Sequence, residues 1–114
     1  MAYRNRLVVE TLRSLGTASI GANYAAVGSA LANPCIAVNF INATDGDVLV
    51  SDDGVNNKFY LPANSFNKYD IDANRLHDTD VLYAKGTTFY AKDGPTPSAN
   101  GTFYIEVLTV QGES

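Results

Sequence analysis

Acidic side chains come closest to a ligand-binding pattern in this sequence. The run Asp70-Ile71-Asp72-Ala73-Asn74 matches the opening D-x-D-x-N of a calcium-binding loop. The later positions do not match, because Arg75 stands where the sharp turn needs a glycine and Val81 where a bidentate glutamate is needed. The prediction for this segment is a hydrated polar loop.

A second acidic cluster consists of Asp45, Asp47, Asp52 and Asp53. If the segments on either side of the Asp45-Gly46 turn pair as strands, two of these carboxylates could approach each other and bind a cation weakly. Asp-Gly and Asp-Asp-Gly are also ordinary turn sequences, and turn formation alone accounts for the cluster. We therefore predict no metal site here.

Nucleophilic and metal-binding residues are scarce. Cys35 is the single cysteine and His77 the single histidine, which excludes an internal disulfide and a zinc-ligand cluster. His77 stands beside Asp78 and Asp80, but no activated serine or cysteine can be assigned to it. Cys35 follows Pro34 at the start of an apolar segment, which is typical of an inert buried thiol. Glycine-rich phosphate-binding motifs are missing too, so the sequence predicts no enzyme, no metal and no cofactor.

The composition is that of one folded domain. The chain has 114 residues, 18% of them charged and 11% aromatic, whereas disordered chains carry high charge and few aromatic residues. The net charge of −4 argues against a protein that coats duplex nucleic acid. The N-terminal residues contain no apolar run long enough for a signal peptide or a membrane-spanning helix, so we expect a cytoplasmic product with no membrane partner.

Strands must position these residues, because strand signals recur along nearly the whole chain. Segments rich in alternating, β-branched or aromatic residues are separated by Gly, Asn, Asp and Pro at roughly 8- to 12-residue intervals. The main predicted strand segments are 7–15, 35–42, 47–52, 58–62, 64–72, 87–92 and 102–110. We predict a single all-β domain over 1–114, an antiparallel β-sandwich of jelly-roll or Ig-like type with about seven or eight short strands. Residues 1–15 form either an N-terminal arm or the first strand. A helix over 7–15 is the alternative, since Val8, Leu12 and Leu15 are spaced i, i+4, i+7, but Thr11 and the Gly16-Thr17 stop favour the strand.

Turn sequences predict which of these strands are neighbours. Asp45-Gly46 predicts a hairpin between 35–42 and 47–52. The turn-rich segment 93–101 predicts a second hairpin between the two strands that flank it. Segment 64–72 mixes apolar and charged residues in one register, which suits an edge strand.

Two segments, 102–110 and 17–33, do not show a simple alternation of apolar and polar residues. In 102–110, apolar residues occupy both faces, with Glu106 as an interruption on one of them, so both faces are expected to be partly covered. Residues 17–33 are small and Ala-rich, which invites a helix, but Gly21 and Gly28 weaken that interpretation.

Tyrosines are candidates for contacts with partners. Tyrosine combines a large apolar area with a polar tip, and it is enriched at protein interfaces. Five of the seven tyrosines follow the predicted strands or their ends: Tyr60, Tyr69, Tyr83, Tyr90 and Tyr104. The interface candidates selected from them are Tyr60, Tyr69 and Tyr90. Such residues can equally cap the ends of a sandwich core.

The basic residues are unevenly placed. Arg4, Arg6 and Arg13 stand against only Glu10 in the first 13 residues, which gives this segment a net charge of +2 and leaves −6 for the remainder. A basic arm on an acidic body can pair with the body of an identical neighbour. The three arginines are therefore interface candidates.

Several stretches taken together point to a family. They are LRSLGTASIGANYAAVGSALANP from Leu12, NATDGDVLVSDDG with the following LPANSF from Asn42, and KGTTFYAKDG joined to GTFYIEV from Lys85. In this order they resemble small virion structural proteins of tailed bacteriophages, over most of the chain. The resemblance carries no catalytic motif, and it implies a β-sandwich that serves a structural role in the virion.

The resemblance implies several copies arranged by symmetry in a virion, made in the host bacterial cytoplasm. A neck or collar protein at the head-to-tail region would form a homo-oligomer held by an N-terminal arm and strand edges, beside portal, connector or tail proteins. A capsid decoration protein would instead bind the major capsid protein on the outer head surface. An alternative from another class is a carbohydrate-binding accessory module, which the absence of Trp and of a usable carboxylate pair disfavours.

Overall fold

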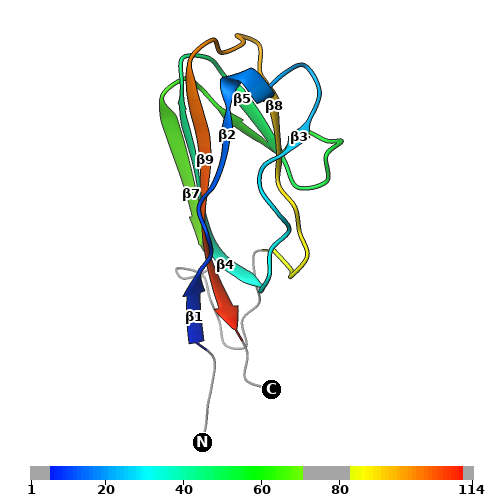
Figure 1. Ribbon diagram of the computed structural model, residues 1–114, viewed down its shortest axis with the longest axis vertical. Coiled ribbons are helices and arrows are strands. Elements are labelled where there is room, and N and C mark those ends of the chain that lie inside the picture. Colours follow the sequence, from blue (N-terminus) through cyan, green and yellow to red (C-terminus); the bar gives the residue numbers. More distant parts are fainter. Residues whose placement is uncertain (1–5, 71–82, 112–114) are drawn as a thin grey trace, which may run out of the picture.

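Two antiparallel β-sheets pack face to face in this protein (Figure 1). The computed structural model describes residues 6–70 and 83–111. Their strands are β1 (Arg6–Val9), β2 (Arg13–Gly16), β3 (Ala25–Ala26), β4 (Cys35–Thr44), β5 (Val48–Ser51), β6 (Phe59–Leu61), β7 (Ser65–Asp70), β8 (Tyr90–Asp93) and β9 (Gly101–Gln111). One sheet has five strands in the order β1-β9-β4-β7, with β2 also on β9, and the other has four in the order β3-β8-β5-β6. The predicted all-β sandwich is confirmed.

The described residues form nine strands because the predicted first strand is broken in two. β1 pairs with the C-terminal end of β9, with Val9 opposite Leu108, and β2 pairs with its N-terminal half, with Arg13 opposite Ile105. Both therefore lie end to end on one edge of the five-stranded sheet. The nine strands exceed the predicted seven or eight, because the first strand is broken and the two-residue β3 lies in a segment where no strand was predicted.

The pairing pattern distinguishes the two predicted sandwich types. β1 and β2 pair with β9, β3 with β8, β4 with β7, and β5 with β6, so the pairs are nested as in one long hairpin. Two further pairings, β4 with β9 and β5 with β8, arise when that hairpin is rolled up. Nested pairs rolled into two sheets define the jelly roll and not the Ig-like sandwich.

Both predicted hairpins are wrong. β4 and β5 lie in different sheets, and so do β8 and β9. The two connections lie side by side at one end of the sandwich, where the Asp47 amide donates to the Thr96 carbonyl over 2.7 Å and the Asp45 amide donates to the Asn100 carbonyl over 3.1 Å. Turn residues permit a sharp change of direction, but they do not determine whether the next strand stays in the same sheet.

The remaining segment predictions fare better. β7 pairs with β4 alone among the described strands, so the predicted edge strand is confirmed. The Ala-rich segment 17–33 contains a single 3₁₀ turn, η1 (Thr17–Ser19), and the two-residue β3, so it forms no α-helix. Its buried apolar residues, Ile20, Val27 and Leu31, extend the core instead.

The core lies between the sheets and is rich in aromatic and β-branched residues. Its central members are Val38, Phe40, Val48, Val50, Leu61, Phe89, Ala91, Phe103, Ile105 and Val107. A register shift between Cys35 and Ala37 places Cys35 in this core, on the same side as Val38 and Phe40. Simple alternation along 35–42 would place Cys35 on the face opposite to Phe40, and the bulge moves Cys35 to the inner face.

Candidate functional site

Three of the seven exposed large hydrophobic side chains among the described residues lie on the outer face of the five-stranded sheet: Leu7, Val9 and Phe66. Side chains of β7, β4 and β9 form cross-strand rows on this face. In the first row, Ile41 of β4 lies between Phe66 of β7 and Tyr104 of β9. Phe66 is 65% exposed, although a phenylalanine in a monomer usually buries most of its ring.

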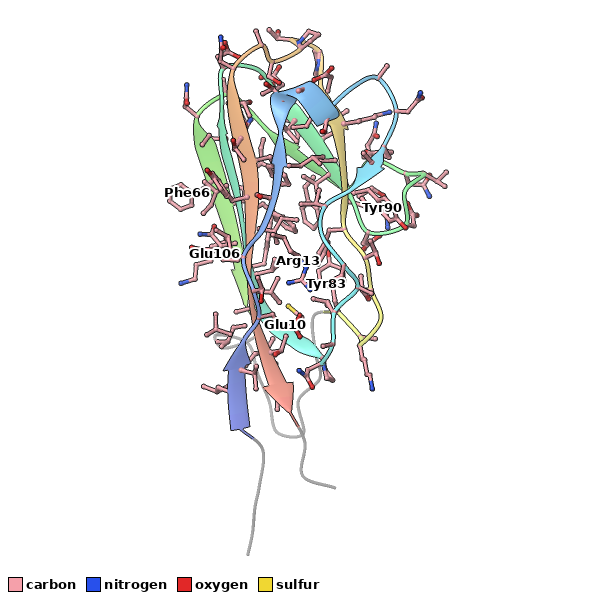
Figure 2. All side chains as sticks on the ribbon, in the orientation of Figure 1. Glu10, Arg13, Phe66, Tyr83, Tyr90 and Glu106 are labelled. Carbon is pink, nitrogen blue, oxygen red and sulfur yellow. The ribbon has the colours of Figure 1, made fainter. Side chains whose placement is uncertain are left out.

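The next row on this face is polar. Asn39 of β4 lies between Lys68 of β7 and Glu106 of β9. The Asn39 side-chain amide donates to Glu106 Oε1 over 3.1 Å. Phe66 and Glu106 both point away from the sandwich, whereas Arg13 lies between the two sheets (Figure 2).

Apolar residues continue the face toward the β1 end. Leu108 of β9 lies opposite Val9 of β1, and Val110 lies opposite Leu7. Val9 is 76% exposed and Leu7 is 64% exposed. We call the residues Leu7, Val9, Asn39, Ile41, Phe66, Lys68, Tyr104, Glu106, Leu108 and Val110 the outer face. No loop of the described ranges crosses it (Figure 1).

The opposite side of the sandwich is partly covered by its own chain. The loop between β5 and β6 folds back on the four-stranded sheet, and a Cβ atom on Gly54 would lie 3.4 Å from the Tyr90 ring. Asp53 holds this loop, because its Oδ1 accepts from the Ser51 hydroxyl over 2.7 Å and from the Val55 amide over 2.8 Å. These hydrogen bonds, the Ser51 bond foremost, keep the pKa of Asp53 well below its usual range. The two sides of the sandwich therefore differ in how well they are covered.

The three predicted interface tyrosines do not share one surface. Tyr60 lies on the four-stranded sheet and is 48% exposed, and burial together with a hydrogen bond to Asp47 raises its pKa. Tyr69 caps the core, with its ring 5.1 Å from Phe59 and 6.1 Å from Phe40 between centroids. Tyr90 is half-buried under the β5–β6 loop. Tyr104, one of the five tyrosines considered but not one of the three selected, lies on the outer face beside Ile41.

The structure describes two of the three arginines that were predicted to contact a partner. Arg4 lies outside the described residues, and Arg6 opens β1 opposite Gln111. Arg13 is only 6% exposed and forms an ion pair with Glu10, which is 8% exposed, over 2.8 Å. Its charge is neutralised inside the fold, so Arg13 is removed from the candidates for contact with a partner.

The Glu10–Arg13 pair has a structural role instead. Arg13 donates to the carbonyl of Ser29, and Glu10 accepts from the amides of Ala32 and Asn33. These bonds join the break between β1 and β2 to the segment before β4. A shallow groove of about 530 Å³ beside them is lined by both charged residues and, among others, by Gly28, Ser29, Ala30, Ala32 and Asn33. Because the pair is already saturated by internal partners, the groove offers no free charged group to a ligand.

The acidic residues serve turns. Asp45 accepts from the amides of Ala99 and Asn100 over 2.7 and 3.0 Å, and these bonds lower its pKa. Asp52 pairs with Lys58 over 3.2 Å. Among the described residues no group of three or more acidic, histidine or cysteine side chains could hold a metal ion. The predicted explanation of this cluster by turn formation agrees with these contacts.

Other candidates are buried or lie outside the description. Cys35 is fully buried, and burial raises the pKa of its thiol to about 11, as expected for an unreactive cysteine. His77 and most of the calcium-like run 70–74 fall outside the described residues.

Among the described residues no helix is long and apolar enough to cross a membrane.

Comparisons with known proteins found no relative of this chain. No family model, no curated protein and no solved structure matches the chain.

Proposed function

We propose that this chain is a non-enzymatic structural component of a tailed-phage virion, an oligomeric protein of the neck or collar region. The observation that carries the proposal is the bare outer face, with Phe66, Val9 and Leu7 exposed on a sheet whose other side is fully packed. An apolar patch of this kind on a folded domain is typical of a surface that contacts another protein. The sequence resemblance to small virion structural proteins supports the same role.

The jelly roll is compatible with this role but does not decide it. Jelly rolls serve in viral capsids and also in lectins, so the fold by itself does not assign an activity. The internal saturation of Glu10, Arg13, Asp45 and Asp53 favours a scaffold over an enzyme, because these charged groups are already held by the protein's own backbone and side chains.

The test is the number of copies in purified particles, measured by quantitative mass spectrometry against the major capsid protein, together with the position in a reconstructed particle. A symmetric collar predicts copies on the order of a dozen at the head-to-tail junction. Hundreds of copies on the outer head would instead identify a decoration protein. Absence from the particle together with saturable binding to host polysaccharide would overturn the proposal in favour of a carbohydrate-binding module.

A further inference from the structure

We propose that the outer face binds the outer face of a second copy of this chain, around a two-fold axis that runs parallel to β4. This inference deepens the proposed function, because it names the partner of the surface on which that function rests. It is argued from the order of charges across β7, β4 and β9.

The polar row sets the geometry. Lys68, Asn39 and Glu106 lie side by side on adjacent strands. Because neighbouring strands are about 4.8 Å apart, Lys68 and Glu106 of one copy are separated by roughly 10 Å and Asn39 lies between them. Among the side chains that the structure describes, none forms an ion pair with Lys68 or Glu106. Both side chains are exposed on the outer face, where a second molecule can reach them.

A two-fold axis along β4 exchanges the positions of β7 and β9. Lys68 of one copy then lies opposite Glu106 of the other, and the symmetry repeats this contact, so two opposite-charge pairs flank Asn39. An axis across the strands through this polar row would place Lys68 opposite Lys68 and Glu106 opposite Glu106. Like charges across an interface cost several kcal/mol, so the charge order selects the axis along the strands.

The apolar rows agree with the same axis. Ile41 lies on the central strand and would meet Ile41 of the second copy, while Phe66 would lie over Tyr104. Aromatic rings with exposed edges and faces gain contact energy beyond their buried area when they pack in offset or edge-on pairs. Sheets that pack face to face with aligned strands commonly use this arrangement, with an angle near −30°.

The overlap is that of a weak pair. An axis along β4 brings β7, β4 and β9 of the two copies over one another and leaves β1 outside, so three strand positions at about 4.8 Å and about ten residues at about 3.3 Å give roughly 500 Å² for each copy. A pair would bury about 1,000 Å², which is the size of a weak specific interface. The opposite side is a poorer candidate, because the β5–β6 loop already covers part of it.

The experiment uses sedimentation velocity of the full-length protein at several concentrations and at two salt concentrations. We expect a dimer that weakens at higher salt. The charge reversals K68E and E106K should each raise the dissociation constant roughly tenfold or more, and the double variant K68E/E106K should restore it to within a few-fold. K85E, which reverses an exposed lysine outside the face, is the matched control and should leave the constant unchanged.

A second pair of variants tests the apolar row without changing charge. Phe66→Ser should dissociate the dimer, whereas Val55→Ser, at an exposed residue of the loop on the opposite side, should not. Thermal unfolding followed by circular dichroism confirms that each variant is folded. A wild type that stays monomeric at about 100 μM, or single reversals without effect, would overturn the inference. Failure of the double variant to recover would overturn the proposed axis.

These outcomes are separate from the test of the virion role. If the purified protein is monomeric while particles contain it with the outer face against a different virion protein, the inference fails and the proposed function stands. If the protein dimerises as described but is absent from particles, the proposed function fails and the interface stands.

Discussion

Removal of the Asn42 side chain is predicted to cost more stability than any other single amide deletion in the described part of the chain. Asn42 is 1% exposed. Its amide nitrogen donates to the carbonyls of Gly46, Leu61 and Pro62 over 2.9 to 3.0 Å, and its oxygen accepts from the Thr44 amide over 3.0 Å. The side chain thereby joins the corner between β4 and β5 to the end of β6.

The magnitude follows from the groups that Asn42→Ala leaves without this partner. Thr44 still donates its hydroxyl to the Gly46 carbonyl, and Ser65 still donates to the Pro62 carbonyl. The Leu61 carbonyl and the Thr44 amide lose the Asn42 bond, and each buried group left unpaired costs about 1–3 kcal/mol. We expect a loss of about 4 kcal/mol, which a domain of this size with roughly 6–17 kcal/mol of stability can survive.

The assay is equilibrium urea unfolding at pH 7, with Asn100→Ala as the matched control. The Asn100 side chain is exposed, lies away from the outer face and donates one hydrogen bond, to Asp45 Oδ2 over 3.3 Å, so its removal should cost less than about 1 kcal/mol. The slope of the unfolding free energy against urea should stay the same in both variants, because neither changes the surface exposed on unfolding by much. A loss below about 1 kcal/mol for Asn42→Ala would refute the reasoning, since it would mean that the bonded carbonyls find water or other partners at no cost.

Three further predictions concern the turns and the buried thiol. The folded-state pKa of Asp53 lies below its ordinary value, so the stability that its carboxylate contributes is present above about pH 4 and is lost as the pH falls. The difference in unfolding free energy between wild type and Asp53→Asn should therefore shrink from pH 6 to pH 3. Gly101 has φ +113° and a Cβ there would lie 2.2 Å from the Ala43 carbonyl oxygen, so Gly101→Ala should lose about 2–4 kcal/mol in urea unfolding, whereas Gly21→Ala, with open space, should lose under about 1 kcal/mol. Cys35 should resist iodoacetamide at pH 8 in the folded protein, as read by mass spectrometry, and react in urea; alkylation at equal rates would contradict its burial.

The sequence predicted the strands well because their signals are local. Alternation in 35–42 and 102–110 and the punctuation by Gly, Asn and Asp located most of the strand segments. Pairing was predicted poorly, because the partner of a strand in a jelly roll lies far away in sequence. β4 pairs with β9 and β7, and only the β5–β6 pair joins consecutive strands.

The candidate site was partly visible in the sequence. The alternation of Tyr104, Leu108 and Val110 on one side of the last strand was an available signal for the outer face. Phe66 was harder to find, because its charged neighbours in the same register suggested only an edge strand. Arg13 was predicted to contact a partner, but it is buried and bonded to Glu10 and to the carbonyl of Ser29. These contacts depend on the break between β1 and β2, which no local sequence pattern predicts.

The two faces of β9 now have different explanations. The inner face, with Phe103, Ile105 and Val107, is fully buried by the four-stranded sheet and the segment before β4. The other face is also apolar apart from Glu106, and strands that are apolar on both faces are typical of sheets covered on both sides. Within the described residues no segment covers this outer face, so the residue pattern of β9 and the exposure of Phe66 both indicate a partner molecule. A second copy of the chain fits this face, because the two-fold axis along β4 places Lys68 of one copy opposite Glu106 of the other.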